Sequence, residues 1–196
     1  MTAAGLLLAA GAGTRMGTPK GLLRDAREVP YLDRVLGTLF EGGCDTVTVV
    51  LGASSQEATA LLAAAGWEND PAVRLVVATD WSEGMGASLR AGLASLAGSS
   101  ADCAVVMLVD LPDIGPGVLE RVITTASGQD SLVRATYAGM PGHPVLLGRA
   151  HWKGLLDSVS GDRGARDYLA GREVVAVECG DLATGADVDR PEDLPR

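Results

Sequence analysis

The first residues that could do chemistry lie in a glycine-rich loop, Leu6–Leu23, which reads LLLAAGAGTRMGTPKGLL. Gly11 and Gly13 would let backbone amides approach an anion closely. Arg15 and Lys20 add two cations, since an arginine can grip two phosphate oxygens and a lysine acts as a mobile point charge. The loop therefore predicts a site for a phosphate chain, and the alternative is a glycine turn with two solvated cations.

Two common phosphate-binding loops do not fit this spacing. A P-loop needs a second glycine five residues after the first, but that place is Met16 when counted from Gly11 and Thr18 when counted from Gly13. The dinucleotide fingerprint G-x-G-x-x-G needs its third glycine at position 16, and Gly17 comes one residue too late. On this criterion a nicotinamide-dependent oxidoreductase fails.

A carboxylate follows the apolar run Cys103–Val109. Asp110 is costly at the end of a buried strand unless it is solvated or paired. Magnesium prefers one or two carboxylates together with substrate phosphates and water. Asp110 is therefore a candidate metal ligand, and helix capping is an alternative that suits Asp113 better.

Alternating strands and helices must position these loops. Apolar runs of strand length are Gly5–Ala9, Thr46–Leu51, Val73–Ala78, Cys103–Val109, Leu132–Ala135, Pro144–Leu147 and Val174–Val177. Helical patterns are Tyr31–Phe40, Gln56–Ala65, Ala87–Ala97, Gly117–Ala126 and Arg163–Ala170, and a hairpin is expected around Gly139–Gly142. This alternation indicates a parallel sheet covered on both faces, in which ligands bind beyond the carboxyl ends of the strands.

Composition limits the partners. The chain has 196 residues, 47% of them hydrophobic, and a net charge of -9, which favours one domain and argues against nucleic acid or an anionic membrane as partner. Three scattered cysteines favour reduced thiols in a cytoplasmic protein over a disulfide framework. No apolar run reaches the roughly 20 residues of a membrane helix.

The segment LAAGAGTRMGTPK resembles the L-A-[AG]-G-x-[GS]-x-R-M-G-x-x-K signature of the MobA-like nucleoside triphosphate transferases. Five later segments resemble the same family, namely TDWSEGMGASLRAGL, VVMLVDLPD, GMPGHPVLL, GDRGARDYL and GADVDRPEDL. The resemblance implies an α/β chain with a three-layer Rossmann-like nucleotidyltransferase fold and a mostly parallel mixed sheet. It also implies a single domain over residues 1–196, with a nucleotide-binding half at about 1–112 and an acceptor-binding half at about 113–196.

The resemblance further implies a role for individual residues. The nucleotide-binding residues would be Leu8, Ala9, Ala10, Gly11, Ala12, Gly13, Arg15, Lys20, Gly84, Gly86 and Ser88. Arg15, Lys20 and Asp110 would be catalytic, and Mg²⁺ would be held by Asp110 with Asp189, or with Asp187 as second choice, although Arg190 replaces the family's usual threonine beside them. The acceptor-binding residues would be Gly142, His143, Arg163 and Arg166.

The implied reaction is transfer of a nucleoside monophosphate unit from a nucleoside triphosphate to a phosphate monoester, with release of pyrophosphate. The A-A-G-x-G form of the loop resembles the branch that uses CTP and molybdopterin, with a recipient molybdoenzyme or its chaperone as a possible protein partner. Asp110-Leu111-Pro112 instead resembles relatives that activate other phosphorylated small molecules, namely guanylyltransferases for phospholactate or phosphoenolpyruvate and enzymes for sugar phosphates. Guanylyl transfer from GTP to molybdopterin is another alternative. A non-catalytic accessory protein that binds the nucleotide is a further alternative.

Overall fold

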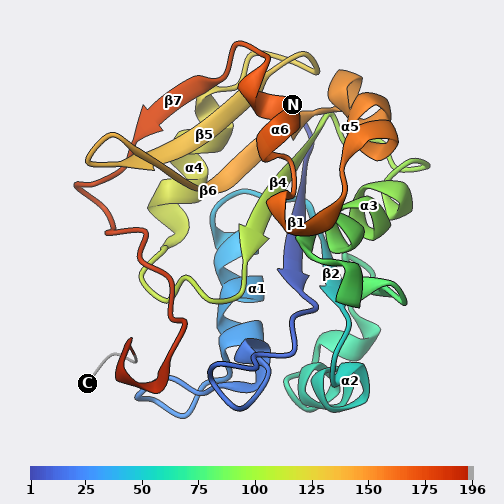
Figure 1. Ribbon diagram of the computed structural model, residues 1–196, viewed down its shortest axis with the longest axis vertical. Helices are drawn as coiled ribbons and strands as arrows, with labels where there is room; N and C mark the ends of the chain where they lie inside the picture. Colours follow the sequence, from blue (N-terminus) through green and yellow to red (C-terminus); the bar gives the residue numbers. More distant parts are fainter. Residues whose placement is uncertain (194–196) are drawn as a thin grey trace.

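A seven-stranded sheet in the order β3-β2-β1-β4-β6-β5-β7 forms the centre of the computed structural model, which describes residues 1–193 (Figure 1). The strands are β1 (Ala3–Ala9), β2 (Thr46–Leu51), β3 (Val73–Val77), β4 (Cys103–Leu108), β5 (Leu132–Tyr137), β6 (Met140–Gly148) and β7 (Val175–Glu178). Strand β6 runs antiparallel to β4 and β5, and the other pairs are parallel. The predicted mostly parallel mixed sheet is confirmed. Residues 194–196 lie outside the described residues; they end the predicted domain and include Leu194 of the last family segment.

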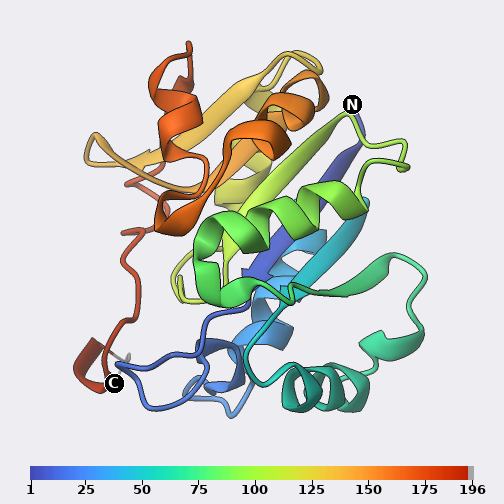
Figure 2. The same ribbon diagram turned by 45° about the vertical axis from the view of Figure 1, so that its right-hand side comes forward.

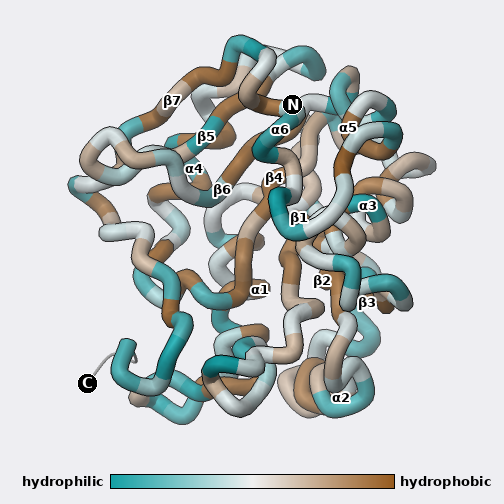
Figure 3. The backbone as a smooth tube through the Cα atoms, in the orientation of Figure 1, coloured by the Kyte–Doolittle hydropathy of each residue, from teal (hydrophilic) through white to brown (hydrophobic). Residues whose placement is uncertain are grey.

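Helices cover both faces of the sheet (Figure 2). One layer contains α1 (Tyr31–Glu41), α2 (Ser55–Ala64) and α4 (Pro116–Thr125), and the other contains α3 (Met85–Ser95), α5 (Trp152–Ser158) and α6 (Arg166–Ala170). Successive side chains of a strand point to opposite faces, so β1 contributes Leu7 to the core under the first layer and Leu6 and Leu8 to the core under the second. Apolar strands therefore form the centre of the molecule, with polar loops outside them (Figure 3).

Two helices differ from the sequence expectation. The predicted helix Arg163–Ala170 is wrong in its first half, because a short 3₁₀ turn at Gly161–Arg163 is followed by Gly164 with a φ of 53°. That left-handed conformation interrupts a right-handed helix, and α6 begins only at Arg166. Helix α5 was not predicted; its buried residues Trp152 and Leu155 pack against the second layer's core.

Strand register brings the chemically distinctive loops together. Leu8 of β1 lies opposite Leu108 of β4, and Ala9 lies opposite Leu51 of β2, so the loops that follow these strands leave the sheet side by side. The antiparallel β6 begins at the same edge, because Val145 pairs with Val106 near the end of β4. Among residues 1–193, no helix is both long and apolar enough to cross a membrane.

Candidate active site

The glycine-rich loop is closed by a tight turn at Gly13. Its carbonyl accepts hydrogen bonds from the backbone N–H groups of Met16 and Gly17, both at 2.9 Å. Gly13 has a φ of 62°, and a Cβ there would lie 1.8 Å from the carbonyl oxygen of Thr18. Only glycine fits this place, so the loop depends on the residue that the sequence singled out.

Replacing Gly13 with alanine is expected to destabilise the protein by about 1–3 kcal/mol, because the side chain meets backbone that cannot yield without opening the turn. Chemical denaturation measures this change. Gly11→Ala is the matched control, since a Cβ at Gly11 meets nothing within 4 Å. A Gly13→Ala variant as stable as Gly11→Ala would contradict the assigned turn geometry.

The C-terminal segment, residues 184–193, lies beside this loop in both ribbon views (Figures 1 and 2). Asp113 accepts hydrogen bonds from the backbone N–H and the hydroxyl of Thr184, at 2.6 and 2.5 Å. The N–H of Val188 donates to the backbone carbonyl of Asp110 at 2.9 Å. Asp113 therefore holds the C-terminal segment rather than capping α4, for which no side-chain cap is found.

Arg190, which departs from the family pattern, does not disturb this segment. The carboxylate of Asp193 accepts hydrogen bonds from the backbone N–H groups of Asp189 and Arg190, at 3.2 and 2.8 Å. These bonds close a turn and need no particular side chain at position 190. The turn holds Asp189 facing the glycine-rich loop.

Lys20 links the two sides of the site. Its ammonium group donates to Oδ2 of Asp110 at 2.7 Å and also to Oδ1 of Asp189. Burial opposes the charge of Lys20, but the hydrogen bonds and negative charges of the two carboxylates outweigh burial and raise the pKa of Lys20. The hydrogen bond from Lys20 in turn lowers the pKa of Asp189.

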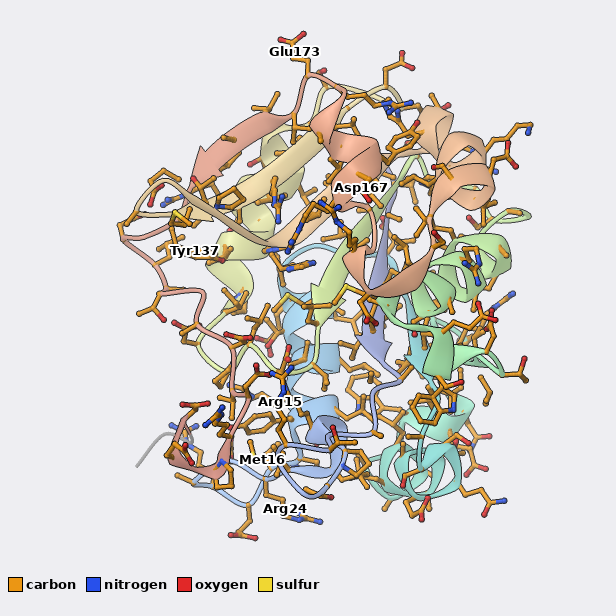
Figure 4. All side chains as sticks on the ribbon, viewed as in Figure 1. Arg15, Met16, Arg24, Tyr137, Asp167 and Glu173 are labelled. Atoms are coloured by element: carbon orange, nitrogen blue, oxygen red, sulfur yellow. The ribbon has the colours of Figure 1, made fainter. Side chains whose placement is uncertain are left out.

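Arg15 contacts the same carboxylate from the solvent side. Its Nη1 lies 2.8 Å from Oδ2 of Asp189, and Figure 4 shows Arg15 near the C-terminal segment. The Arg15 side chain is 70% exposed, whereas that of Lys20 is 18% exposed. Arg15 is therefore free to turn towards a ligand, and Lys20 is held in the site.

Three carboxylates gather here and fit a divalent cation. Asp110, Asp187 and Asp189 each offer an oxygen atom, and these atoms all lie within 4.8 Å of one another. Oδ1 of Asp110 is buried and has no hydrogen-bond partner among residues 1–193. A buried carboxylate oxygen without a partner is costly, and a hard cation would satisfy it.

A cavity of about 460 Å³ opens between the glycine-rich loop and the N-terminus of α3. Of the predicted nucleotide-binding residues it is lined by Leu8, Ala9, Ala10, Gly11, Ala12, Gly13, Lys20, Gly84 and Ser88, together with Asp110. Arg15 and Gly86 do not line it. Gly86 instead packs against residues 160–161, where a Cβ would lie 2.8 Å from the carbonyl carbon of Ser160.

A second cavity, of about 180 Å³, adjoins the first and shares Leu8, Leu108, Met85 and Asp162 with it. His143, Arg163 and Arg166 of the predicted acceptor residues line this second cavity, but Gly142 does not. The guanidinium of Arg163 lies 3.0 Å from Asp167 and is therefore partly neutralised.

The two cavities also contain residues that the sequence analysis did not assign. Trp81, Met85 and Asp162 line the first, and Arg134 lines the second. Trp81 and Met85 lie in the TDWSEGMGASLRAGL segment, so the resemblance already pointed to their neighbourhood. Arg134 lies within the predicted strand run Leu132–Ala135, and nothing in the local pattern marks it as a site residue.

His143 is uncharged at neutral pH. Burial and the neighbouring positive charge of Arg134 lower the pKa of His143 to about 4. The ring therefore adds no charge to the second cavity.

His143→Gln is expected to flatten the pH dependence of stability below about pH 6.5, the ordinary pKa of histidine. A lowered pKa means that the unfolded chain takes up a proton before the folded one does. The wild type therefore has its full stability above about pH 6.5 and loses up to about 3 kcal/mol relative to the variant as pH falls towards 4. Urea unfolding at pH 7, 5.5 and 4.5 measures the difference, and parallel curves for the two proteins would contradict it.

The fold is that of the nucleotidyltransferases. Residues 5–177 match the family model described as the MobA-like NTP transferase domain. The match covers most of the chain, and the protein belongs to this family of nucleotidyltransferase enzymes. The resemblance found in the sequence is thereby confirmed.

Individual relatives extend the comparison. The nicotine blue oxidoreductase of Paenarthrobacter nicotinovorans is 37% identical over 206 residues, covering 98% of this chain and 94% of the relative. Rv0371c of Mycobacterium tuberculosis H37Rv is 30% identical with a TM-score of 0.76, covering 98% of this chain and 96% of that one. A structure of the Rv0371C complex with manganese superposes with a TM-score of 0.73, at 28% identity and with coverage of 98% and 96%. A nucleotidyl transferase from Methanothermobacter, 20% identical with a TM-score of 0.79 and coverage of 98% and 94%, shares the fold.

Proposed function

We propose that the protein transfers a nucleoside monophosphate unit from a nucleoside triphosphate to a phosphate monoester and releases pyrophosphate. The observation that carries this proposal is the bonded group of Lys20, Asp110 and Asp189 at a cavity lined by the glycine-rich loop. A cavity of about 460 Å³ has the usual size of a small-molecule site. The nucleotide-binding half, at about 1–112, then supplies the loop, and residues from about 113 onwards supply most of the acceptor side.

Within this proposal, the backbone amides of the loop bind the triphosphate, and Arg15 and Lys20 stabilise the pyrophosphate as it leaves. Asp110 and Asp189, with Asp187 beside them, hold Mg²⁺ or Mn²⁺. The cation would supply charge neutralisation at the reacting phosphates. Lys20 and Arg15, which pair with carboxylates in the ligand-free protein, exchange those partners for phosphate oxygens.

The acceptor needs no general base in this scheme. A phosphate monoester with a second pKa near 6 is largely dianionic at pH 7 and is already a nucleophile. The site contains no histidine suited to remove a proton, since His143 lies in the second cavity with its pKa lowered to about 4. Catalysis then rests on alignment of the two substrates and on charge stabilisation.

As the finer assignment we propose CTP as the donor and molybdopterin as the acceptor. The support is the Ala9–Gly13 sequence, AAGAG, which lines the first cavity and has the form of the cytidylyl branch. Asp110-Leu111-Pro112 keeps GTP and other phosphorylated acceptors as the alternatives. The proposal places the protein in the cytoplasm, where its three free cysteines stay reduced, and leaves a recipient molybdoenzyme or its chaperone as partner.

A second candidate function is favoured by one observation. The relative that is 37% identical over almost its whole length bears the name of an oxidoreductase. Glycine spacing alone therefore does not exclude a nicotinamide-dependent oxidoreductase for this chain. In that case the glycine-rich loop would bind the phosphates of the cofactor, and the second cavity would accept the substrate to be reduced or oxidised.

Thermal melting with each nucleotide separates these functions. CTP, GTP, ATP and UTP are tested with Mg²⁺, and NADH and NADPH without it, on the wild type and on Asp110→Asn. A ligand at 100 times its dissociation constant adds about 2.7 kcal/mol of stability. We expect CTP with Mg²⁺ to give the largest shift and Asp110→Asn to lose most of it, followed by pyrophosphate release when the acceptor is added.

Each other outcome has a defined meaning. A larger shift with GTP, ATP or UTP keeps the transferase and refutes cytidylyl transfer. If the protein binds a triphosphate but releases no pyrophosphate with any of the acceptors tested, the result favours the non-catalytic accessory protein. A shift with NADH or NADPH that Asp110→Asn retains supports the oxidoreductase and overturns the proposal.

A further inference from the structure

Arg134 occupies a place in the sheet where an apolar residue is expected. On β5 it stands two residues after Leu132, and its partner across the strand pair is Val145 of β6. Leu132 and Val145 both belong to the core under α3, α5 and α6. Side chains two apart on a strand, and opposite one another on paired strands, share a face of the sheet, so Arg134 brings a guanidinium group to the margin of that core.

This guanidinium group has no carboxylate partner. Its Nε donates to the carbonyl of Gly142 at 3.1 Å, and its terminal nitrogens have no hydrogen-bond partner among residues 1–193. No acidic group in that part of the chain forms an ion pair with Arg134 or Arg166; the single pair in this cavity joins Arg163 to Asp167. An unpaired cation at the margin of a core is costly, and a bound anion would remove that cost.

Arg166 places a second positive charge in the same cavity, which further favours binding of an anion. Arg134 and Arg166 both line the cavity, so two like charges share it. Burial and the charge of Arg166 accordingly lower the pKa of Arg134. The remaining walls include the apolar Leu89, Val145 and Leu169 and one carboxylate, Asp162, which forms no ion pair with either arginine among residues 1–193. The cavity does not include Lys20 or Asp110, so its cations are separate from the reaction centre.

We propose that Arg134 and Arg166 bind an anionic group of the second substrate whose adjoining body is apolar and packs along Leu89 and Val145. As a statement about the acceptor it rests on the proposed transferase function. It then specifies the acceptor class as a molecule with two anionic groups. One is the phosphate that reacts beside Lys20 and Asp110, and the other is a non-reacting phosphate or carboxylate held in the second cavity. This class fits the alternative acceptors phospholactate and phosphoenolpyruvate better than molybdopterin, whose single phosphate is the reacting group.

The test uses small probes that carry one anion on an apolar ring. Phenyl phosphate, benzoate and phenol are titrated by calorimetry into the wild type, with and without saturating Mg²⁺ and nucleotide. We expect phenyl phosphate or benzoate to bind and phenol not to, and the stronger of the two identifies the anion. Arg134→Met and Arg166→Met are each expected to weaken that affinity by about tenfold or more, since each removes a charge-assisted hydrogen bond.

Controls separate recognition from folding. Arg166 is exposed and makes no side-chain hydrogen bond among residues 1–193, so Arg166→Met tests the proposal even if loss of the Arg134–Gly142 bond harms folding. Arg172→Met is the matched control, because Arg172 stacks on the ring of Tyr168 outside this cavity. It is expected to keep the affinity within about twofold.

Three outcomes would overturn the inference. In the first, the wild type binds neither phenyl phosphate nor benzoate. In the second, both arginine variants keep the wild-type affinity. In the third, Lys20→Met loses affinity but the arginine variants do not. The rise in melting temperature with Mg²⁺ and nucleotide tests the proposed function independently of anion binding. Arg166→Met is expected to retain that shift, so failure of nucleotide binding and failure of anion binding are distinguishable.

Discussion

Replacing Asp110 with asparagine is expected to lower nucleotidyl transfer about a thousandfold, equivalent to roughly 4 kcal/mol. Asp110 is the least exposed carboxylate of the acidic cluster, at 16% against 37% for Asp189. Asparagine keeps its shape but removes the negative charge that the proposed cation needs. A steady-state assay of pyrophosphate release measures the turnover, and a titration followed by the paramagnetism of Mn²⁺ measures the weakened metal affinity.

The same substitution is expected to leave the free energy of unfolding within about 1 kcal/mol of the wild type, or to raise it. The reason is that the buried Oδ1 of Asp110 has no partner among residues 1–193, which offsets the ion pair that Oδ2 makes with Lys20. Lys20 keeps its bond to Asp189 in the variant. Asp181→Asn is the control, since Asp181 is a surface carboxylate paired with Arg121 at 2.6 Å, away from the cluster. Full turnover in Asp110→Asn, or an equal loss in Asp181→Asn, would refute the assignment.

The sequence predicts the centre of the sheet well because strands β1, β2 and β4 are buried on both faces. Continuous apolar runs such as Thr46–Leu51 cannot be mistaken for solvent-exposed loops, and β2 has these same bounds. The predicted helix around Arg163 was wrong because Gly164 has a φ of 53° and packs close to Met85, where a Cβ would lie 3.1 Å from Sδ of that distant residue. A local pattern does not contain that contact. Helix α5 is only seven residues long, too short for helical periodicity to stand out.

The candidate site divides in the same way. Gly13, Lys20 and Asp110 could be found from the sequence, because each stands where a strand gives way to a loop and ligands bind at that edge of a parallel sheet. Asp187 and Asp189 could be placed only through the family resemblance, since the C-terminal segment reaches the site through long-range bonds such as Val188 to Asp110. Arg134 could not be found, because its position depends on the pairing of β5 with β6 and on a cavity formed with α6.

Lys20→Met is expected to lower turnover about 30- to 900-fold, equivalent to about 2–4 kcal/mol, while raising the affinity of the protein for Mn²⁺ in the absence of nucleotide. Methionine keeps much of the length of the side chain and removes its charge. In the ligand-free protein the ammonium group of Lys20 is bonded to Asp110 and Asp189, the oxygens that would bind the cation. Two unit charges about 4 Å apart interact by roughly 1–4 kcal/mol near a protein surface, so removing the Lys20 charge is expected to raise metal affinity by about fivefold or more.

These two opposite changes distinguish the proposed role from a structural one. If Lys20 only neutralised the acidic cluster, saturating Mn²⁺ would restore the turnover of Lys20→Met, because the metal would replace the missing charge. If Lys20 instead stabilises the leaving pyrophosphate, turnover stays low at every metal concentration. Arg15→Met is the informative comparison, since Arg15 contacts Asp189 alone and is 70% exposed. Replacing Arg15 is expected to leave metal affinity nearly unchanged. If saturating Mn²⁺ restored the turnover of both Lys20→Met and Arg15→Met, that result would argue against a direct role of these residues in phosphate binding.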